Sequence, residues 1–271
     1  MDALTPAAVA ELLEDLAQLL PFPTHGASTT GPAPTDHHPQ LAPLAPITPN
    51  PEDTMTAIQE LTPTTHPAVW ALLALGDDAP ERLWVRGNAD ALTARQAVAL
   101  TGCRASTAYG EHVGGELAAD LAKTHTIVTG GAYGIDAQAA YATLNSSGTG
   151  VIVAAGGVNR VHPQGHRELA ARIIETGGAI VSEVEPDEAP NRYRFARRQR
   201  LVAALSAGSV IVEAGWRSGS LSVATWAREL GRPVGALPGP LTSVTSSGTH
   251  QLIRGGATLI TSADDVRQML V

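Results

Sequence analysis

The sequence predicts a doubly wound α/β domain with a mostly parallel sheet, because two patterns run together through residues 80–271. Short apolar runs alternate with helical stretches, and the runs are rich in β-branched residues and apolar on both faces. Strands of this kind are typical of a parallel sheet that is covered by helices on both sides. Each strand, helix and next strand then make a right-handed crossover, which gives a Rossmann-like architecture.

Seven runs are predicted to be the strands of this sheet. Between the first two, Tyr109, Val113, Leu117 and Leu121 recur every four residues, which predicts a helix over 106–123. The predicted strands are 96–101, 126–130, 151–156, 178–183, 209–214, 233–237 and 258–260.

Residues 1–79 are expected to form a separate, acidic and helical appendage ahead of a domain over 80–271. They contain ten acidic residues and no Lys or Arg, in a chain whose net charge is -8. Nine prolines between Pro21 and Pro51 predict a disordered linker over 21–51, because such a segment buries too little apolar surface to order itself. Helices are expected on both sides of the linker. They start after Thr5, near Asn50 to Asp53, and at Pro67, the last one ending at Gly76.

Composition excludes several classes of protein. No apolar run approaches the ~20 residues that cross a bilayer, and the acidic N-terminus lacks the features of a targeting signal, so we expect a cytoplasmic protein. The single cysteine, Cys103, cannot form an intramolecular disulfide and is expected to be a small buried residue. The histidines of the chain lack neighbouring carboxylates or cysteines, so neither a metal nor a cofactor is expected.

Four loops that follow predicted strands have the composition of phosphate-binding loops. Glycines let the backbone approach a ligand, and the helix N-terminus that follows attracts negative charge. Arg104, Arg160 and Arg217 come from three of these loops, and the arginine-rich stretch NRYRFARRQR (191–200) precedes the fifth strand. We therefore expect the arginines to converge on one face and bind an anionic ligand. Arg200 has a structural alternative, a buried ion pair with Glu213 or Glu183. The four loops are 101–110, 129–136, 154–163 and 213–222.

The motifs in these loops, taken in order, resemble those of the DNA-processing protein A family (DprA, also called Smf). The sequence departs from the family pattern at Cys103, Tyr133, His162 and Gln199. Tyr133 stands where a basic residue is frequent, which removes one positive charge. The matching motifs are Gly102-Cys103-Arg104 with Ser106, Tyr109 and Gly110; Thr129 to Asp136; Gly157 to Pro163; Phe195 to Arg200; Glu213 with Ser218 to Ser220; and Leu252 to Ala257.

The resemblance implies a non-catalytic protein that binds single-stranded DNA, forms a homodimer and assists RecA loading during natural transformation or recombination. Guanidinium groups suit phosphates, and the rings of Tyr133, Tyr193, Phe195 and Trp216 offer faces on which bases stack. By motif position, the DNA-binding residues are expected to be Arg104, Ser106, Tyr109, Gly130, Gly131, Tyr133, Gly134, Arg160, Arg194, Phe195, Arg197, Arg198, Arg200, Arg217, Ser218, Gly219 and Ser220.

A second hypothesis is a sensor of nucleotides or a phosphoribohydrolase on the same kind of fold. Such hydrolases carry a catalytic carboxylate after a glycine-rich loop, whereas the run after Ser220 is apolar here, so the general base is missing. Asp136 is expected to cap a helix or to hold a loop in place rather than to act in catalysis. No catalytic residue is therefore predicted.

Overall fold

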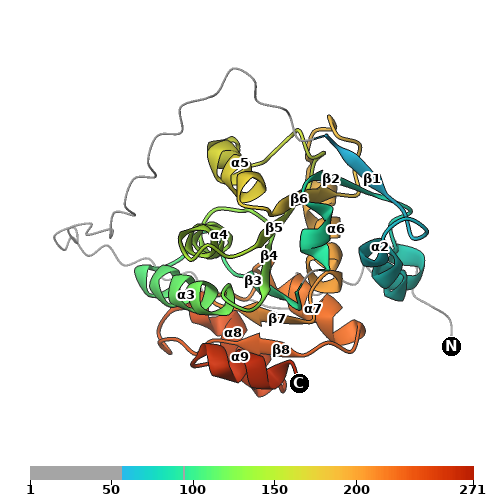
Figure 1. Ribbon diagram of the computed structural model, residues 1–271. Coiled ribbons are helices and arrows are strands. Elements are labelled where there is room, and N and C mark those ends of the chain that lie inside the picture. Colours follow the sequence, from blue (N-terminus) through green and yellow to red (C-terminus); the bar gives the residue numbers. More distant parts are fainter. Residues whose placement is uncertain (1–56, 94) are drawn as a thin grey trace, which may run out of the picture. The chain divides into compact units, whose positions relative to one another are not determined.

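The computed structural model describes residues 57–93 and 95–271, whose strands form one nine-stranded sheet (Figure 1). The order across the sheet is β1-β2-β6-β5-β4-β3-β7-β8-β9, and all neighbours from β6 to β9 are parallel. The predicted fold class and all seven predicted strands are confirmed. These strands are β3 (Ala97–Thr101), β4 (Thr126–Thr129), β5 (Gly150–Val153), β6 (Ala179–Ser182), β7 (Gly208–Ile211), β8 (Val234–Ala236) and β9 (Thr258–Leu259).

Two more strands, β1 (Gln59–Leu61) and β2 (Leu83–Gly87), extend the sheet beyond β6 and run antiparallel to their neighbours. Neither strand was predicted, because β1 is three residues long and β2 buries only alternate residues, so neither forms a continuous apolar run in the sequence. β1 lies within the segment 1–79 and pairs with β2. The described end of that segment is therefore part of the sheet. The helices expected near residues 5 and 50 and the linker 21–51 lie outside the described residues.

The predicted helix start at Pro67 is confirmed by α2 (Pro67–Ala71). The His66 side chain caps it by accepting a hydrogen bond from the amide of Ala68 at 3.2 Å. Tighter 3₁₀ turns continue over Leu72–Asp78, where Gly76 takes a positive φ of 59° that glycine adopts without strain. Val69 and Leu72 are fully buried in the core beneath β1 and β2.

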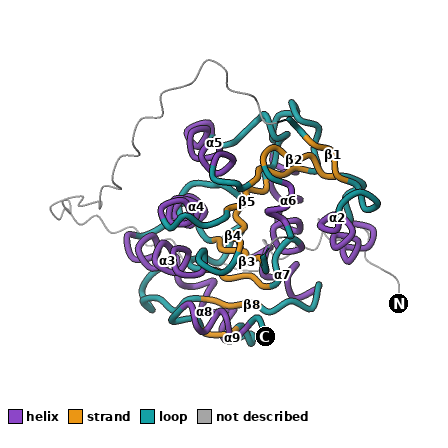
Figure 2. The backbone as a smooth tube through the Cα atoms, in the orientation of Figure 1, coloured by secondary structure: helices purple, strands orange, loops and turns teal. Residues whose placement is uncertain are grey.

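Helices cover both faces of the sheet, as Figure 2 shows. Alternate residues of β3 point to opposite cores, Val98 and Leu100 to one and Ala97 and Ala99 to the other. The first core is completed by helices on that side, and a neighbouring cluster continues it under α5. One face carries α3 (Ala108–Leu121), α4 (Ile135–Asn145), α5 (Arg167–Glu175) and α9 (Ala263–Met269); the other carries α2, α6 (Arg192–Ala204), α7 (Leu221–Glu229) and α8 (Ser247–Arg254).

This winding places the starts of α3, α4 and α7 at the edge where β3, β4 and β7 end. The helix predicted over 106–123 is α3, in which Leu117 and Leu121 are buried and Tyr109 is 44% exposed. Within the described residues, every helix is too short or too polar to cross a membrane.

Candidate nucleic-acid interface

The loops at the carboxyl edge of the sheet touch one another in the order of their strands. Gly134, in the loop after β4, packs so closely on the carbonyls of Cys103 and Arg104 that a Cβ atom there would lie 2.4 Å from the first oxygen. The amide of Cys103, in the loop after β3, donates to the carbonyl of Glu213 after β7 at 2.8 Å. Residues far apart in the sequence therefore form one continuous surface.

A small pocket of about 30 Å³ lies between these loops and α6, and we call it the Phe195 pocket. Two guanidinium groups lie over the Phe195 ring. Arg104 Cζ is 5.3 Å from the ring centroid, and Arg198 Cζ is 5.8 Å from it. His162 meets the same ring edge-on at 5.2 Å. A pocket with two cations and aromatic faces suits a phosphate with an adjoining flat ring. It is lined by Arg104, Ala132, Tyr133, His162, Pro163, Phe195 and Arg198.

Arg198 is the buried cation of this pocket, with only 4% of the residue exposed. Its guanidinium donates to the carbonyls of Gly130 and Val153, and its Nε has no hydrogen-bond partner among the described residues. Burial lowers the pKa of Arg198, an effect that nearby Asp136 opposes and Arg104 reinforces. No carboxylate forms a direct ion pair with it in the described part of the chain, so an anion at the pocket would supply the missing charge.

Asp136 holds the loop after β4 in place, which is one of the two structural roles expected for it. Its carboxylate accepts hydrogen bonds from the Thr101 hydroxyl at 2.6 Å and from the amides of Gly130 and Ala132 at 3.0 and 3.3 Å. The amide of Gly131 donates to the Thr129 hydroxyl. The expectation that the amides of Gly130 and Gly131 face a phosphate is therefore wrong, because both amides already donate hydrogen bonds to side chains of the protein.

The amides of Tyr133 and Gly134 differ from these, because no described residue accepts a hydrogen bond from either. Tyr133 is 54% exposed, and its ring meets His166 edge-on with centroids 4.7 Å apart. These two amides and the Tyr133 ring are what the loop presents to a ligand.

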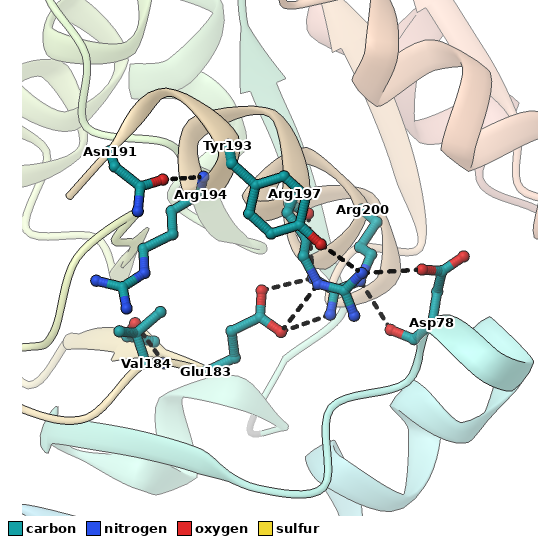
Figure 3. A network of polar contacts seen from close by, with 9 residues as sticks. Asp78, Glu183, Val184, Asn191, Tyr193, Arg194, Arg197 and Arg200 are labelled. Carbon is teal, nitrogen blue, oxygen red and sulfur yellow. Dashed lines mark hydrogen bonds and ion pairs between the residues drawn. The ribbon is translucent and has the colours of Figure 1, made fainter. Parts of the chain in front are cut away.

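The arginine-rich helix α6 has two faces with opposite surroundings. Phe195 and Arg198 line the pocket, while Arg197 and Arg200 lie about half a turn away on the helix. Figure 3 shows Arg197 and Arg200 beside Glu183 and Asp78. Arg200 is 1% exposed and forms a two-pronged ion pair with Glu183, and its Nε donates to the carbonyl of Asp78 at 2.7 Å. Of the two partners considered for Arg200, Glu183 is therefore the one it has.

The other arginines of α6 that were expected in the pocket are also paired. Arg197 lies 3.2 Å from Asp78 and 3.8 Å from Glu183, and Arg194 lies 2.9 Å from Glu188. The expected convergence of all these arginines is thus wrong for Arg194, Arg197 and Arg200. Helical periodicity cannot direct positions 197, 198 and 200 to one side. The carboxylates of Asp78, before β2, and of Glu183 and Glu188, in the loop after β6, bind Arg194, Arg197 and Arg200, and none of these three arginines lines the pocket.

Glu213 ties together the loops after β3, β7 and β8. Its carboxylate accepts from the Thr107 amide and hydroxyl at 2.9 and 2.6 Å and from the Thr245 hydroxyl at 3.0 Å. Beside it, burial and the charge of Glu213 raise the pKa of the Cys103 thiol to about 12. This cysteine is half-buried rather than buried as expected, and it is kept as a neutral thiol.

The remaining predicted residues lie at varying distances from the pocket. The Ser106 hydroxyl donates to Glu111 at 2.6 Å, and the Tyr109 hydroxyl donates to the carbonyl of Pro238. Tyr109 lines a separate groove of about 510 Å³ between α3 and α9, so it does not belong to the Phe195 pocket. Arg160 and Arg217 are exposed at the two sides of the loop cluster, and Ser218 bonds to Ser220 at 2.8 Å.

Three lining residues were absent from the predicted site: Ala132, His162 and Pro163. The signal for His162 and Pro163 was the loop after β5, whose motif GGVNRVHP was recognised but contributed only Arg160 to the prediction. Ala132 lies in the motif Thr129 to Asp136, from which only the glycines and Tyr133 were predicted. Among the described residues, no group of three or more His, Cys, Asp or Glu side chains is arranged to hold a metal ion.

The sequence and the structure were compared with known proteins. The family model for DNA recombination-mediator protein A matches residues 61–271. The putative DNA processing protein DprA of Mycobacterium tuberculosis is 50% identical over 190 residues, which cover 69% of this chain and 48% of that protein. The chain thus spans about half the length of this curated relative.

Two solved structures share the fold. The X-ray structure of DNA processing protein A from Streptococcus pneumoniae matches with a TM-score of 0.72 and 32% identity, covering 79% of this chain and 75% of that one. A structure of the Helicobacter pylori protein of the same name, which concerns its single-stranded DNA binding mode, matches with a TM-score of 0.67 and 32% identity. That match covers 74% of this chain and 91% of the other.

Proposed function

Because the chain belongs to the DNA recombination-mediator protein A family (DprA/Smf) through residues 61–271, we propose that it binds single-stranded DNA in the Phe195 pocket. The observation that carries the proposal is the Arg198 guanidinium, which is buried at the pocket without a direct carboxylate partner and leaves its Nε unbonded among the described residues. A buried charge of this kind is costly unless a ligand anion compensates it.

Each group at the pocket has a role in this proposal. Arg104 and Arg198 bind one phosphate between them, and the amides of Tyr133 and Gly134 donate to its remaining oxygens. The rings of Phe195 and Tyr133 stack on the bases that flank that phosphate. Arg217 is exposed and attracts the strand on the β7 side. Arg160 is also exposed, on the β5 side, but its loop packs on the loop after β6, which exposes carboxylates.

The proposal is one of binding without catalysis. Both carboxylates closest to the loops, Asp136 and Glu213, are engaged by hydroxyls and backbone amides and hold loops in position. No carboxylate is among the residues that line the Phe195 pocket. This arrangement supports a ligand-binding site more than the general-base chemistry of a phosphoribohydrolase.

The test is a titration of a fluorescent oligothymidylate by anisotropy over a series of salt concentrations. We expect affinity to fall as salt rises, with a logarithmic slope that shrinks by about 0.7 when Arg104→Ala removes one phosphate contact. The control is Arg254→Ala, which removes the same charge from an exposed residue at the end of α8, on the opposite edge of the sheet. Equal slopes for both variants, or binding of a mononucleotide in preference to the oligonucleotide, would contradict the proposal and favour a nucleotide sensor.

Family membership also supports a cellular role. We propose that the protein acts as a homodimer in the cytoplasm and helps to load RecA on single-stranded DNA during DNA uptake or recombination. Sedimentation of the purified protein measures the first part, and RecA filament formation on DNA coated by a single-strand-binding protein measures the second.

A further inference from the structure

A second exposed aromatic and basic surface lies beside the Phe195 pocket, in the loop after β7. Trp216 is 60% exposed there, and the neighbouring Arg217 is exposed as well. Val244, 79% exposed, lies beside this loop, because the Ala214 amide donates to the carbonyl of the neighbouring Thr245 at 2.7 Å. We call these three residues the Trp216 surface. Indole rings and guanidiniums on one exposed loop are the groups that hold a base and its phosphate.

The Trp216 surface is continuous with the Phe195 pocket. Gln199 donates to the carbonyl of Gly219 at 3.2 Å, which joins α6 to the loop after β7. Gln199 follows Phe195 by four residues, so both side chains project from the same face of α6, about 6 Å apart along the helix axis. A DNA strand with one base stacked on Phe195 can therefore reach the Trp216 surface with its next nucleotides.

The opposite side of the pocket is acidic. The loop after β6 exposes Glu185, Asp187 and Glu188, and it packs on the loop after β5, where the Gly157 amide donates to the carbonyl of Glu188 at 2.9 Å. A phosphate backbone that left the pocket toward β6 would approach these carboxylates, whereas one that left toward β7 would approach Arg217.

We propose that Trp216 and Arg217 form a second nucleotide subsite, so that single-stranded DNA crosses the carboxyl edge of the sheet from the Phe195 pocket toward β7 and β8. The inference rests on the proposed function of the pocket. Trp216 stacks on one base, and Arg217 binds the phosphate beside it. β4 and β7 are two strand spacings apart, about 10 Å, so the two subsites hold different nucleotides of one strand.

The experiment measures affinity against the length of oligothymidylates from about 4 to 16 nucleotides, the range of site sizes of single-strand-binding domains. It compares the full chain with Trp216→Ala and with Trp70→Ala, which removes a tryptophan of similar exposure (66%) from α2. Long oligonucleotides are expected to bind Trp216→Ala about 10- to 100-fold more weakly, the loss of one stacked base. The shortest oligonucleotides, which fill only the Phe195 pocket, are expected to bind both variants as they bind the wild type.

Tryptophan fluorescence gives an independent reading of the same contact. Oligonucleotide binding is expected to quench the emission of the wild type and of Trp70→Phe, and to leave the emission of Trp216→Phe nearly unchanged. If Trp216→Ala binds every length like the wild type while Arg104→Ala weakens every length, the second subsite is overturned and the proposed function stands. If the wild type binds no oligonucleotide, both are overturned.

Discussion

At the scale of single residues, α6 carries two buried arginines whose surroundings differ. Arg200 is matched by the Glu183 carboxylate and by the carbonyl of Asp78, and it joins α6 to the end of β6 and to residues before β2. Arg198 bonds two carbonyls and has no direct ion pair in the described part of the chain. The first guanidinium is a structural cross-link. The second is held in place at some cost in free energy, as is frequent for binding groups.

Opposite effects are therefore expected when the two arginines are replaced. Arg200→Ala removes the two-pronged partner of Glu183 and leaves this carboxylate only Arg197 at 3.8 Å. It should lower the free energy of unfolding by about 3 kcal/mol, while the folded protein keeps its DNA affinity. Arg198→Met keeps the volume and removes a buried charge that no direct ion pair offsets, so the free energy of unfolding should change by about 1 kcal/mol or less while DNA affinity falls at least about tenfold. Urea unfolding and oligonucleotide titration measure the two quantities. The reverse pattern would show that Arg198 is the structural residue.

At the scale of elements, the close packing of the loop after β4 on the loop after β3 sets the position of Arg104. Gly134 has a positive φ of 75°, and a Cβ atom there would lie 2.6 Å from the carbonyl oxygen of Arg104. Gly177, in the turn before β6, has a similar φ of 84° with nothing within 4 Å of such an atom. The two glycines share a positive φ and differ in what surrounds them.

This difference makes a matched pair of substitutions. Both Gly134→Ala and Gly177→Ala should lose about 1 kcal/mol of stability or more, because an alanine is strained at a positive φ. Only Gly134→Ala must also push the Arg104 backbone away, so it should lose further stability and weaken oligonucleotide binding, whereas Gly177→Ala should bind like the wild type. Melting curves and anisotropy titrations test both parts. Unchanged binding by Gly134→Ala would mean that the contact between these loops does not position Arg104.

At the scale of the whole molecule, the sheet is longer than its parallel part. β1 and α2 close it at one end, and they bring Leu61, Val69 and Leu72 into the same core as β5 and β6. Asp78, just after them, also contacts Arg197 and Arg200. Residues 57–79 thus support the helix that carries Phe195 and Arg198.

A chain that starts at residue 80 should therefore be less stable than one that starts at residue 57. It loses the buried side chains of Leu61, Val69, Leu72 and Leu75, worth roughly 6 kcal/mol or more together, and exposes the edge of β2 to other molecules. Urea unfolding and light scattering of the two chains measure the difference. Equal unfolding midpoints would support a domain boundary at residue 79, as the charge pattern of the sequence suggests.

Much of the fold and the ligand loops could be predicted from the sequence because their signals are local. An apolar run such as 209–214 buried on both faces indicates a central parallel strand wherever the chain goes next. The glycines after β3, β4 and β7 likewise indicate positions where the backbone turns tightly or closely approaches a ligand. Arg104, Phe195 and Arg198 were recognised through such motifs, and the structure brings them together.

Tertiary structure alone decided which arginines face the pocket and which face carboxylates. The period of α6 shows that Arg198 and Arg200 cannot share a side, but the partners that choose the side, Asp78, Glu183 and Asp136, come from three other segments. The same holds for the amides of Gly130 and Gly131, which look free for a phosphate until Asp136 and Thr129 are seen to occupy them. Hydrogen bonds and ion pairs depend on distances of a few ångströms between distant segments, and the sequence specifies those distances only through the folded chain.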